Sequence, residues 1–237
     1  RGNRERMCIA TKVFNEYPGA EGGLGARQIE TECEKSLKRL RTDVIDLFYA
    51  HTDDRQVPLE ETLEAFDRLV RAGKVRVLGA SNFRAWRLEC ARCVSANHGW
   101  APYCCIQQRY SYLRPRSGAE FNPLTPPATD DLLDFCRENP LPLIAYSPLM
   151  KGAYDRADRD FSAEYTGPDA DARLAVLHAV AEEVGAKPTQ VVLAWMLHSA
   201  PPVIPLFSAS TLEQLRSNLG AVGVKLTAEQ MERLNKA

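Results

Sequence analysis

The feature that most constrains the fold of this chain is a regular alternation of short apolar runs with segments of helical periodicity. Six runs have the length and residue types of buried strands: 8–13, 44–50, 75–81, 103–107, 141–147 and 202–207. Six other segments repeat apolar residues three and four positions apart, as amphipathic helices do: 26–40, 59–73, 84–99, 129–139, 169–185 and 189–199. Strands that alternate with helices form parallel sheets with right-handed crossovers, so the sequence predicts an α/β fold.

The position of the polar residues distinguishes two α/β architectures. An open doubly wound sheet needs a glycine-rich phosphate turn between its first strand and the next helix. The glycines of segment 15–26 do not have that placement, and the sequence predicts a loop there. In a (β/α)8 barrel, functional residues follow the C-terminal ends of successive strands. Polar or aromatic residues do so at all six predicted strands: Lys12, His51, Ser81 with Asn82, Gln107, Tyr146 with Ser147, and Ser208 to Ser210. The sequence therefore favours a barrel with one shared site, formed as a single domain over residues 1–237.

Composition limits the partners of this chain. It has 30 basic and 31 acidic residues, so no broad field of one sign would attract nucleic acid or an anionic membrane surface. No apolar stretch reaches the roughly 20 residues that cross a bilayer. The charged start "RGNRERM" is not followed by an apolar segment of signal-peptide type. We expect a cytoplasmic protein whose partner is a small molecule, and the oligomeric state is left open.

The seven cysteines indicate reduced thiols rather than a disulfide framework or a metal site. Cys90 and Cys93 form a CxxC without a matching second pair, and the adjacent Cys104 and Cys105 are poorly placed to chelate. We expect no metal.

Six segments of the chain resemble, in order and spacing, the aldo-keto reductases: "IATKV", "DLFYAH", "LGASNF", "IQQRY", "AYSPL" and "VIPLFSASTLEQLRSN". Members of this family are (β/α)8 barrels that reduce aldehydes and ketones with NADPH. The resemblance spans nearly the whole chain and implies that Lys12 and His51 belong to a catalytic tetrad. The lysine pairs with an aspartate and lowers the pKa of a tyrosine that protonates the carbonyl oxygen, and the histidine orients the substrate. The alternatives are a solvated strand-end lysine and a core histidine.

The same resemblance assigns cofactor contacts to the later strand ends. Ser81, Asn82 and Gln107 would hydrogen-bond the nicotinamide carboxamide, and Tyr146 would stack on the nicotinamide ring. The remaining implied contacts are to the pyrophosphate and the adenosine phosphate, and they comprise Ser147, Leu149, Lys151, Ser208, Ser210, Gln214 and Asn218. The structural alternatives are a helix N-cap at Ser81–Asn82, loop polarity, core packing of Tyr146 and a solvated helix face.

One departure from the family concerns the choice of cofactor. Many relatives have a glycine and then an arginine where this chain has Ser208 and Ser210, and that arginine grips the 2′-phosphate of NADPH. Serine hydroxyls and the N-terminus of a helix opened at Thr211 would replace it here. NADPH remains the expected cofactor, with NADH possible.

A second departure concerns the start of the barrel. In the family, the tetrad tyrosine and aspartate lie upstream of the "ATK" segment, and Lys12 is only the twelfth residue here. The six runs would then be strands 3–8, with the first two βα units absent from this chain. Either the natural protein has those units, or it is a short form with an open barrel. We favour the first reading because an open barrel would expose two strand edges.

Three functions remain open on the sequence. The first is an NADPH-dependent carbonyl reductase. The second is a nucleotide-binding protein without turnover that resembles the channel-associated β subunits of the same superfamily. The third makes Lys12 the Schiff-base nucleophile of an aldolase-like barrel. The carbonyl substrate is undetermined: loops 113–128 and 151–168 would wall the pocket, and Arg109, Arg114 and Arg116 would either favour an acidic substrate or belong to the surface.

Overall fold

The structure, a computed structural model, describes residues 2–15 and 22–237. Contacts divide the chain into two compact units, Arg1–Gln107 with Thr129–Leu141 and Gln108–Ala128 with Pro142–Ala237. The single barrel domain stays a prediction. Most of the loop predicted at 15–26, residues 16–21, lies outside the described residues.

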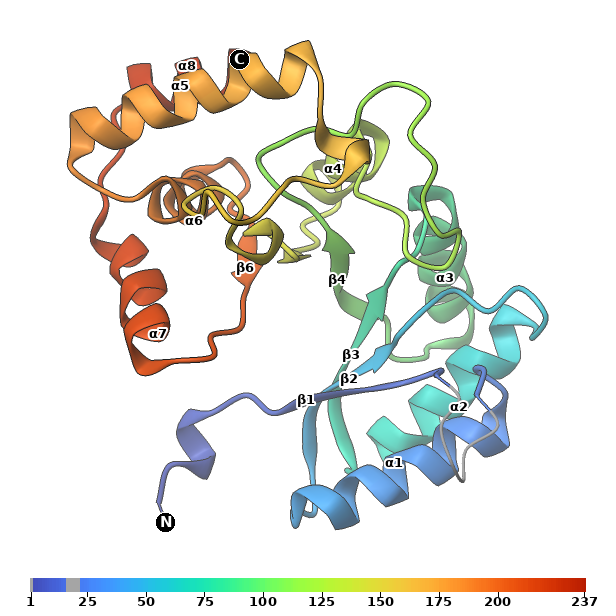
Figure 1. Ribbon diagram of the computed structural model, residues 1–237. Coiled ribbons are helices and arrows are strands. Elements are labelled where there is room, and N and C mark those ends of the chain that lie inside the picture. Colours follow the sequence, from blue (N-terminus) through green and yellow to red (C-terminus); the bar gives the residue numbers. More distant parts are fainter. Residues whose placement is uncertain (1, 16–21) are drawn as a thin grey trace. The chain divides into compact units, whose positions relative to one another are not determined.

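The first unit contains four parallel strands in chain order, with helices between them (Figure 1). Its strands are β1 (Ala10–Val13), β2 (Ile45–Ala50), β3 (Val75–Ser81) and β4 (Tyr103–Arg109), the last two residues of β4 belonging to the second unit. Its helices are η1 (Arg4–Arg6), α1 (Ala26–Leu40), α2 (Leu59–Arg71), α3 (Ala85–His98) and α4 (Asp130–Glu138).

The two faces of this sheet differ in what they carry. One face holds Phe48, Leu78 and Ile106, all fully buried, and Phe48 packs edge-on against Phe66 of α2 with ring centroids 5.5 Å apart. Burying such side chains contributes about 1.5–3 kcal/mol each. Because side chains alternate along a strand, the residues next to these three point to the other face. That other face carries the candidate active-site residues.

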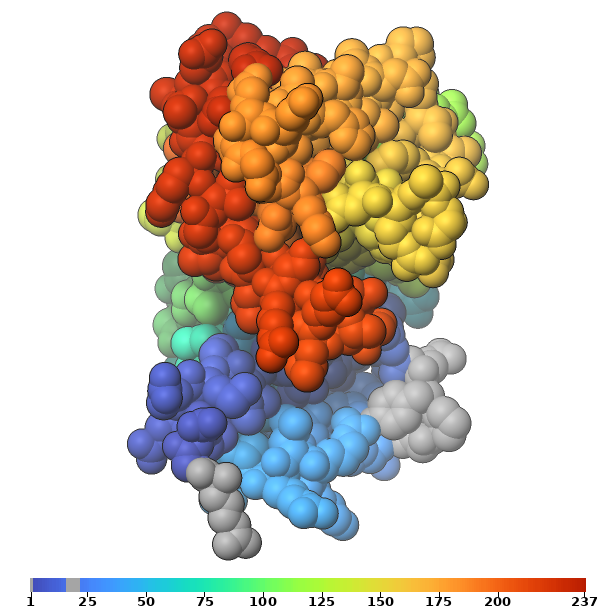
Figure 2. All heavy atoms as spheres, turned by 60° about the vertical axis from the view of Figure 1, so that its left-hand side comes forward, coloured from blue at the N-terminus to red at the C-terminus, as the bar shows by residue number. Residues whose placement is uncertain are grey.

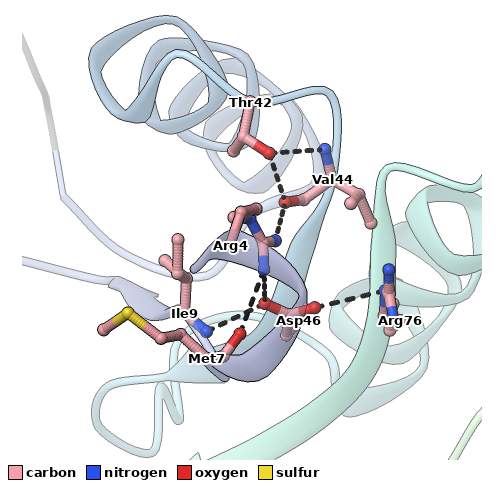
Figure 3. Close-up of polar contacts among 7 residues, drawn as sticks. All are labelled: Arg4, Met7, Ile9, Thr42, Val44, Asp46 and Arg76. Atoms are coloured by element: carbon pink, nitrogen blue, oxygen red, sulfur yellow. Dashed lines mark hydrogen bonds and ion pairs between the residues drawn. The ribbon is translucent and has the colours of Figure 1, made fainter. Parts of the chain in front are cut away.

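The N-terminal end of β2 is fixed by an ionic cluster around Asp46 (Figure 3). Its carboxylate accepts from the backbone N–H of Ile9 at 2.8 Å and pairs with Arg4 at 2.7 Å and Arg76 at 3.2 Å. Arg4 also donates to the carbonyl of Val44 at 3.1 Å. Chiefly the Ile9 hydrogen bond, and then Arg4, hold the pKa of Asp46 below its ordinary value. The cluster ties the segment before β1 to the start of β2.

The second unit contains two parallel strands and most of the C-terminal helices. Its strands are β5 (Leu143–Tyr146) and β6 (Ile204–Leu206). Its helices are η2 (Met150–Gly152), η3 (Ala163–Tyr165), α5 (Pro168–Val184), α6 (Pro188–His198), α7 (Leu212–Leu219), η4 (Gly220–Gly223) and α8 (Ala228–Lys236).

Helices α5 and α8 pack against each other, as the orange and red segments of Figures 1 and 2 show. Arg173 of α5 is buried, with its guanidinium 4.3 Å from the ring centroid of Tyr112. It donates to the carbonyls of Tyr112, Leu234 and Ala237. A buried cation is thus satisfied by carbonyl oxygens and an aromatic face, and it anchors the end of α8.

The predicted α/β elements are confirmed, with small changes at their ends. The six strands and the six helices predicted from periodicity all form, and Gly73, Gly99 and Gly185 adopt φ values of 71°, 65° and 63° just after three of the helices. Helix α8 was not predicted, although Thr227 and Gln230 form a capping box at its start. In the part of the chain described, no helix is both long and apolar enough to cross a membrane. A closed eight-stranded barrel stays a prediction.

Candidate active site

Lys12 and His51 lie next to each other at the C-terminal ends of β1 and β2. The two strands are in register there, and the backbone N–H of His51 donates to the carbonyl of Val13 at 2.9 Å. Burial lowers the pKa of Lys12. Burial and, second, the charge of Lys12 lower the pKa of His51. The imidazole therefore stays neutral at pH 7, where it can act as a hydrogen-bond donor to a carbonyl oxygen.

The ammonium group of Lys12 faces an aromatic ring instead of a carboxylate. Its Nζ lies 5.3 Å from the ring centroid of Tyr49, which is 1% exposed. Within residues 2–15 and 22–237, Lys12 forms no ion pair. Among the described residues, the ring face is therefore the group that offsets part of the cost of burying the cation.

Asn15 contacts the imidazole of His51 and was not identified from the sequence. Its side-chain Nδ2 lies 3.1 Å from Nδ1 of His51. An amide nitrogen only donates, so Nδ1 accepts and the ring proton resides on Nε2. Nothing in the residue pattern marks Asn15, since it belongs to no motif and only follows β1 by two positions. The contact leaves an N–H at Nε2 as the donor of His51.

Ser81, Asn82 and Gln107 come together at the ends of β3 and β4. The backbone N–H of Asn82 donates to the carbonyl of Gln107 at 3.2 Å, and Nδ2 of Asn82 donates to the carbonyl of His51 at 2.9 Å and to Oγ of Ser81 at 3.1 Å. Asn82 has a φ of 60°, a left-handed conformation that asparagine adopts more readily than most residues. The alternative of a helix N-cap does not hold, since Arg84 occupies that position of α3.

The side-chain amide of Gln107 makes no hydrogen bond among the described residues. Gln107 is 6% exposed. A side-chain amide offers both a donor and an acceptor, so an unpaired one can bind another amide. It is the observation on this sheet edge that best fits a bound carboxamide.

The loop after β5 has a strained backbone. Ser147, Met150 and Lys151 adopt φ values of 58°, 46° and 58°. Left-handed conformations at non-glycine residues cost energy and cluster at functional sites. The predicted pyrophosphate residues Ser147, Leu149 and Lys151 fall within this turn, and two of them, Ser147 and Lys151, have the left-handed backbone conformation, whereas Leu149 has a φ of −96°.

Tyr146, at the end of β5, has a cation at its ring. The Cζ atom of Arg109 lies 5.8 Å from the ring centroids of both Tyr146 and Phe121. Arg114 donates to the carbonyl of Asn235 at 3.0 Å, and Arg116 donates to that of Ala163 at 3.0 Å. All three arginines therefore have structural partners within the second unit, and this favours the reading that they belong to the fold.

The segment after β6 begins α7 with a side-chain cap. Oγ1 of Thr211 accepts from the N–H of Gln214 at 3.1 Å, and Oε1 of Gln214 accepts from the N–H of Ser210 at 2.8 Å. The helix predicted to open at Thr211 is confirmed. Ser208, Ser210 and Gln214 are exposed and Asn218 is half-buried. Gln214 therefore has a capping role here, and its role as an adenine contact stays a prediction.

The cysteines do not gather into a chelating group. All seven are free thiols, and Cys90, Cys93 and Cys104 are exposed. Across the described ranges, no three or more His, Cys, Asp or Glu side chains are placed to hold a metal ion.

Comparisons with known proteins give consistent matches. The model of the Aldo/keto reductase family matches residues 1–237. The uncharacterized oxidoreductase YrpG of Bacillus subtilis is 32% identical over 245 residues, which cover 98% of this chain and 72% of YrpG. The norsolorinic acid reductase stcV of Emericella nidulans is also 32% identical, and the match covers 98% of this chain and 60% of stcV.

A solved structure shows the same relationship. The thermostable aldo-keto reductase Tm1743, crystallised with the inhibitor epalrestat, is 33% identical with a TM-score of 0.76. The match covers 98% of this chain and 72% of the Tm1743 chain. This chain thus spans about three fifths to three quarters of the length of the relatives to which it is similar.

Proposed function

Because this chain belongs to the aldo/keto reductase family, we propose that it reduces an aldehyde or ketone to the alcohol by hydride transfer from NADPH. The observation that carries the proposal is the row of side chains at the ends of β1 to β4. The register of these strands brings five predicted residues to one edge of one sheet: Lys12, His51, Ser81, Asn82 and Gln107. This arrangement supplies both a hydrogen-bond donor for a carbonyl oxygen and an amide for a carboxamide.

The residues of this edge fit the nicotinamide end of the cofactor, which supplies the hydride when it is bound. Addition of hydride to a carbonyl carbon places negative charge on the oxygen, and that charge must be met by a proton or an oriented donor. The Nε2–H of His51 is such a donor. The ammonium of Lys12 would lower the pKa of a neighbouring phenol, so that the phenol transfers its proton more readily.

The other cofactor contacts rest on the family resemblance. We assign stacking on the nicotinamide ring to Tyr146 and pyrophosphate contacts to Ser147, Leu149 and Lys151, which the strained turn after β5 supports. Ser208, Ser210, Gln214 and Asn218 are assigned to the adenosine phosphate. NADPH is preferred over NADH because the N-terminus of α7 and two hydroxyls would face the 2′-phosphate.

That the tetrad tyrosine and aspartate lie upstream of Lys12 stays a prediction. Lys12 has no carboxylate partner among the described residues, and its ammonium lies over the ring of Tyr49. The expectation that two N-terminal βα units lie outside this chain is not supported by the family match, which runs over residues 1–237. The cytoplasmic location and the small-molecule carbonyl partner likewise stay predictions.

The test is consumption of NADPH absorbance with 4-nitrobenzaldehyde, followed with the full chain and with Lys12→Met and His51→Gln variants. We expect turnover that falls at least about a hundredfold in each variant, since general acid catalysis contributes about 10²–10⁴ in rate. Lys38→Met, an exposed lysine at the end of α1, is the matched control and should keep the wild-type rate. Equal rates in all four proteins would refute the proposal.

One second candidate is a nicotinamide-nucleotide-binding protein without turnover, similar to potassium-channel β subunits, and the absence of an ion pair to Lys12 within residues 2–15 and 22–237 favours it. Quenching of NADPH fluorescence on binding, with no consumption for any reactive aldehyde, would identify this function. The lowered pKa of Lys12 also suits a Schiff-base amine. Borohydride trapping of a carbonyl ligand on Lys12 would show that chemistry instead.

A further inference from the structure

The Tyr49 ring lies in a row that crosses the first unit's sheet. Lys12 pairs with Tyr49 between β1 and β2, and Tyr49 pairs with Gly79 between β2 and β3. Residues in register across parallel strands point to the same face. Lys12, Tyr49 and Gly79 are therefore side by side on the face that carries the candidate active site, one layer below His51 and Ser81.

Gly79 creates the space in which the Tyr49 ring lies. A Cβ atom at position 79 would come within 2.5 Å of Cε1 and 2.6 Å of Cδ1 of Tyr49. Such distances are far inside van der Waals contact, so any residue larger than glycine would displace the ring. The ring thus passes directly over the backbone of β3, where only glycine leaves room.

Cys105 of β4 contacts the hydroxyl end of the Tyr49 side chain. Its thiol donates to the hydroxyl of Tyr49 at 3.5 Å, and both side chains are buried. Burial, with the Cys105 hydrogen bond as the second cause, raises the pKa of Tyr49 far above its ordinary value. The phenol is therefore neutral and its hydroxyl is already engaged with sulfur. Tyr49 is unsuited to be the proton donor of the reaction, and its contact with Lys12 is through the ring face.

We propose that Tyr49 is a positioning residue for Lys12: its ring, held by Gly79 and Cys105, attracts the ammonium and fixes its place at the end of β1. A cation within about 6 Å of an aromatic centroid is attracted by the ring quadrupole, most strongly where water is scarce. The 5.3 Å separation meets the first condition, and the 1% exposure of Tyr49 with the partial burial of Lys12 meets the second. The inference rests on the proposed function for its role in catalysis, while the contact itself is independent of it.

The experiment measures the protonation of Lys12 in the full chain, independently of turnover. The rate of labelling by trinitrobenzenesulfonate is followed against pH, and the Lys12 peptide is quantified by mass spectrometry. Three variants are compared with the wild type: Tyr49→Met removes the ring, Tyr49→Phe keeps it without the hydroxyl, and Gly79→Ala forces it to move. Tyr103→Leu is the matched control, because Tyr103 is a buried ring that packs against Phe83, with centroids 5.6 Å apart.

Loss of the ring face should remove stabilisation of the charged form, so Lys12 should titrate at lower pH in Tyr49→Met and in Gly79→Ala. Tyr49→Phe and Tyr103→Leu should titrate as the wild type does. In turnover, Tyr49→Met should lower kcat about tenfold with little change in KM, as expected when a cation–π contact of ordinary strength is lost from the chemical step. Tyr49→Phe should restore most of kcat.

Two outcomes would overturn the inference. In the first, the titration of Lys12 in Tyr49→Met is unchanged or moves to higher pH. If Tyr49→Met does not fold, the same result in Gly79→Ala decides. The other is an equal change in Tyr49→Phe or Tyr103→Leu, which would show that loss of packing rather than of the ring face is responsible. A wild-type chain that consumes no NADPH refutes the proposed function alone, because the labelling comparison does not depend on turnover.

Discussion

At the scale of single residues, the hydrogen bond from Asn15 to His51 determines which nitrogen of the imidazole carries the proton. A neutral imidazole has one donor and one acceptor, and the partner of one nitrogen decides the role of the other. With Nδ2 of Asn15 at Nδ1, 3.1 Å away, the remaining nitrogen carries the proton. A carbonyl oxygen placed at Nε2 can accept a hydrogen bond from a neutral ring only in that form.

Asn15→Asp should reverse this assignment. A carboxylate only accepts, so it would draw the proton to Nδ1 of His51, and it would also raise the pKa of the imidazole. The measurement is the pair of imidazole nitrogen chemical shifts in ¹⁵N NMR, which distinguish the two tautomers. Asn15→Leu is the control, and it should leave a mixture of tautomers. An unchanged Nε2–H form in Asn15→Asp would contradict the assignment.

The pKa of His51 should rise when the charge of Lys12 is removed. Burial and the Lys12 charge both lower this pKa below 6.5. The folded chain therefore binds the His51 proton less readily than the unfolded chain. The associated stability is present above pH 6.5 and is lost as the pH falls through the folded pKa.

Lys12→Met should move the NMR titration of His51 toward 6.5 without reaching it, because burial remains. Lys38→Met should have no effect on the titration of His51. A shift of equal size in that variant would show that the charge of Lys12 does not specifically lower the pKa of His51.

At the scale of elements, the two ends of β2 have different roles. The C-terminal end carries Tyr49, is followed directly by His51, and belongs to the candidate active site. The N-terminal end carries Asp46, whose partners come from three segments: Arg4 of η1, Ile9 before β1, and Arg76 of β3. In parallel α/β folds this division between a functional and a stabilising end is common.

Asp46→Asn should lower the free energy of unfolding by about 1–2 kcal/mol at pH 7, because an oxygen remains to accept from Ile9 while both ion pairs are lost. The depressed pKa of Asp46 means that its contribution is present above pH 3.8 and is lost as the pH falls through the folded pKa. Urea unfolding at several pH values measures this. The variant should approach the wild type in acid. Asp134→Asn, an exposed partner of Arg137, is the control with an expected change near zero.

The order of the elements could be predicted from the sequence, and several contacts could not. Strands and helices follow from local periodicity, and the strand-end residues follow from their order. The Tyr49–Gly79 packing and the Asn15–His51 bond depend on register between separate strands, which no single segment encodes. Helix α8 was missed because Leu234 is its one fully buried side chain. Gln214 was assigned to adenine from family spacing, while the structure gives it a capping hydrogen bond.

At the scale of the whole molecule, the charge balance and the family together direct attention to a small ligand. The net charge of −1 provides no general attraction for polyanions, so an anionic cofactor must be held by local groups. Such a cofactor should stabilise the folded chain in proportion to its binding. This provides a measurement that needs no knowledge of the carbonyl substrate.

NADPH at about 100 times its dissociation constant should raise the free energy of unfolding by about 2.7 kcal/mol, and the melting temperature should rise accordingly. NADH at the same concentration should give a smaller rise if the 2′-phosphate is bound near α7. Gln107→Leu should reduce the effect of both nucleotides, since the carboxamide is common to them. Differential scanning fluorimetry measures the melting temperature with each nucleotide, and ATP is the control. An equal rise with ATP would argue against nicotinamide recognition.

The glycine at position 79 also constrains the history of this sequence. Since a methyl group there would occupy the space of the Tyr49 ring, position 79 cannot take a larger residue while position 49 keeps its ring. Homologues with a larger residue in place of Gly79 should carry a smaller one in place of Tyr49, so substitutions at these two sites should be correlated. In such homologues another group must meet the lysine that corresponds to Lys12.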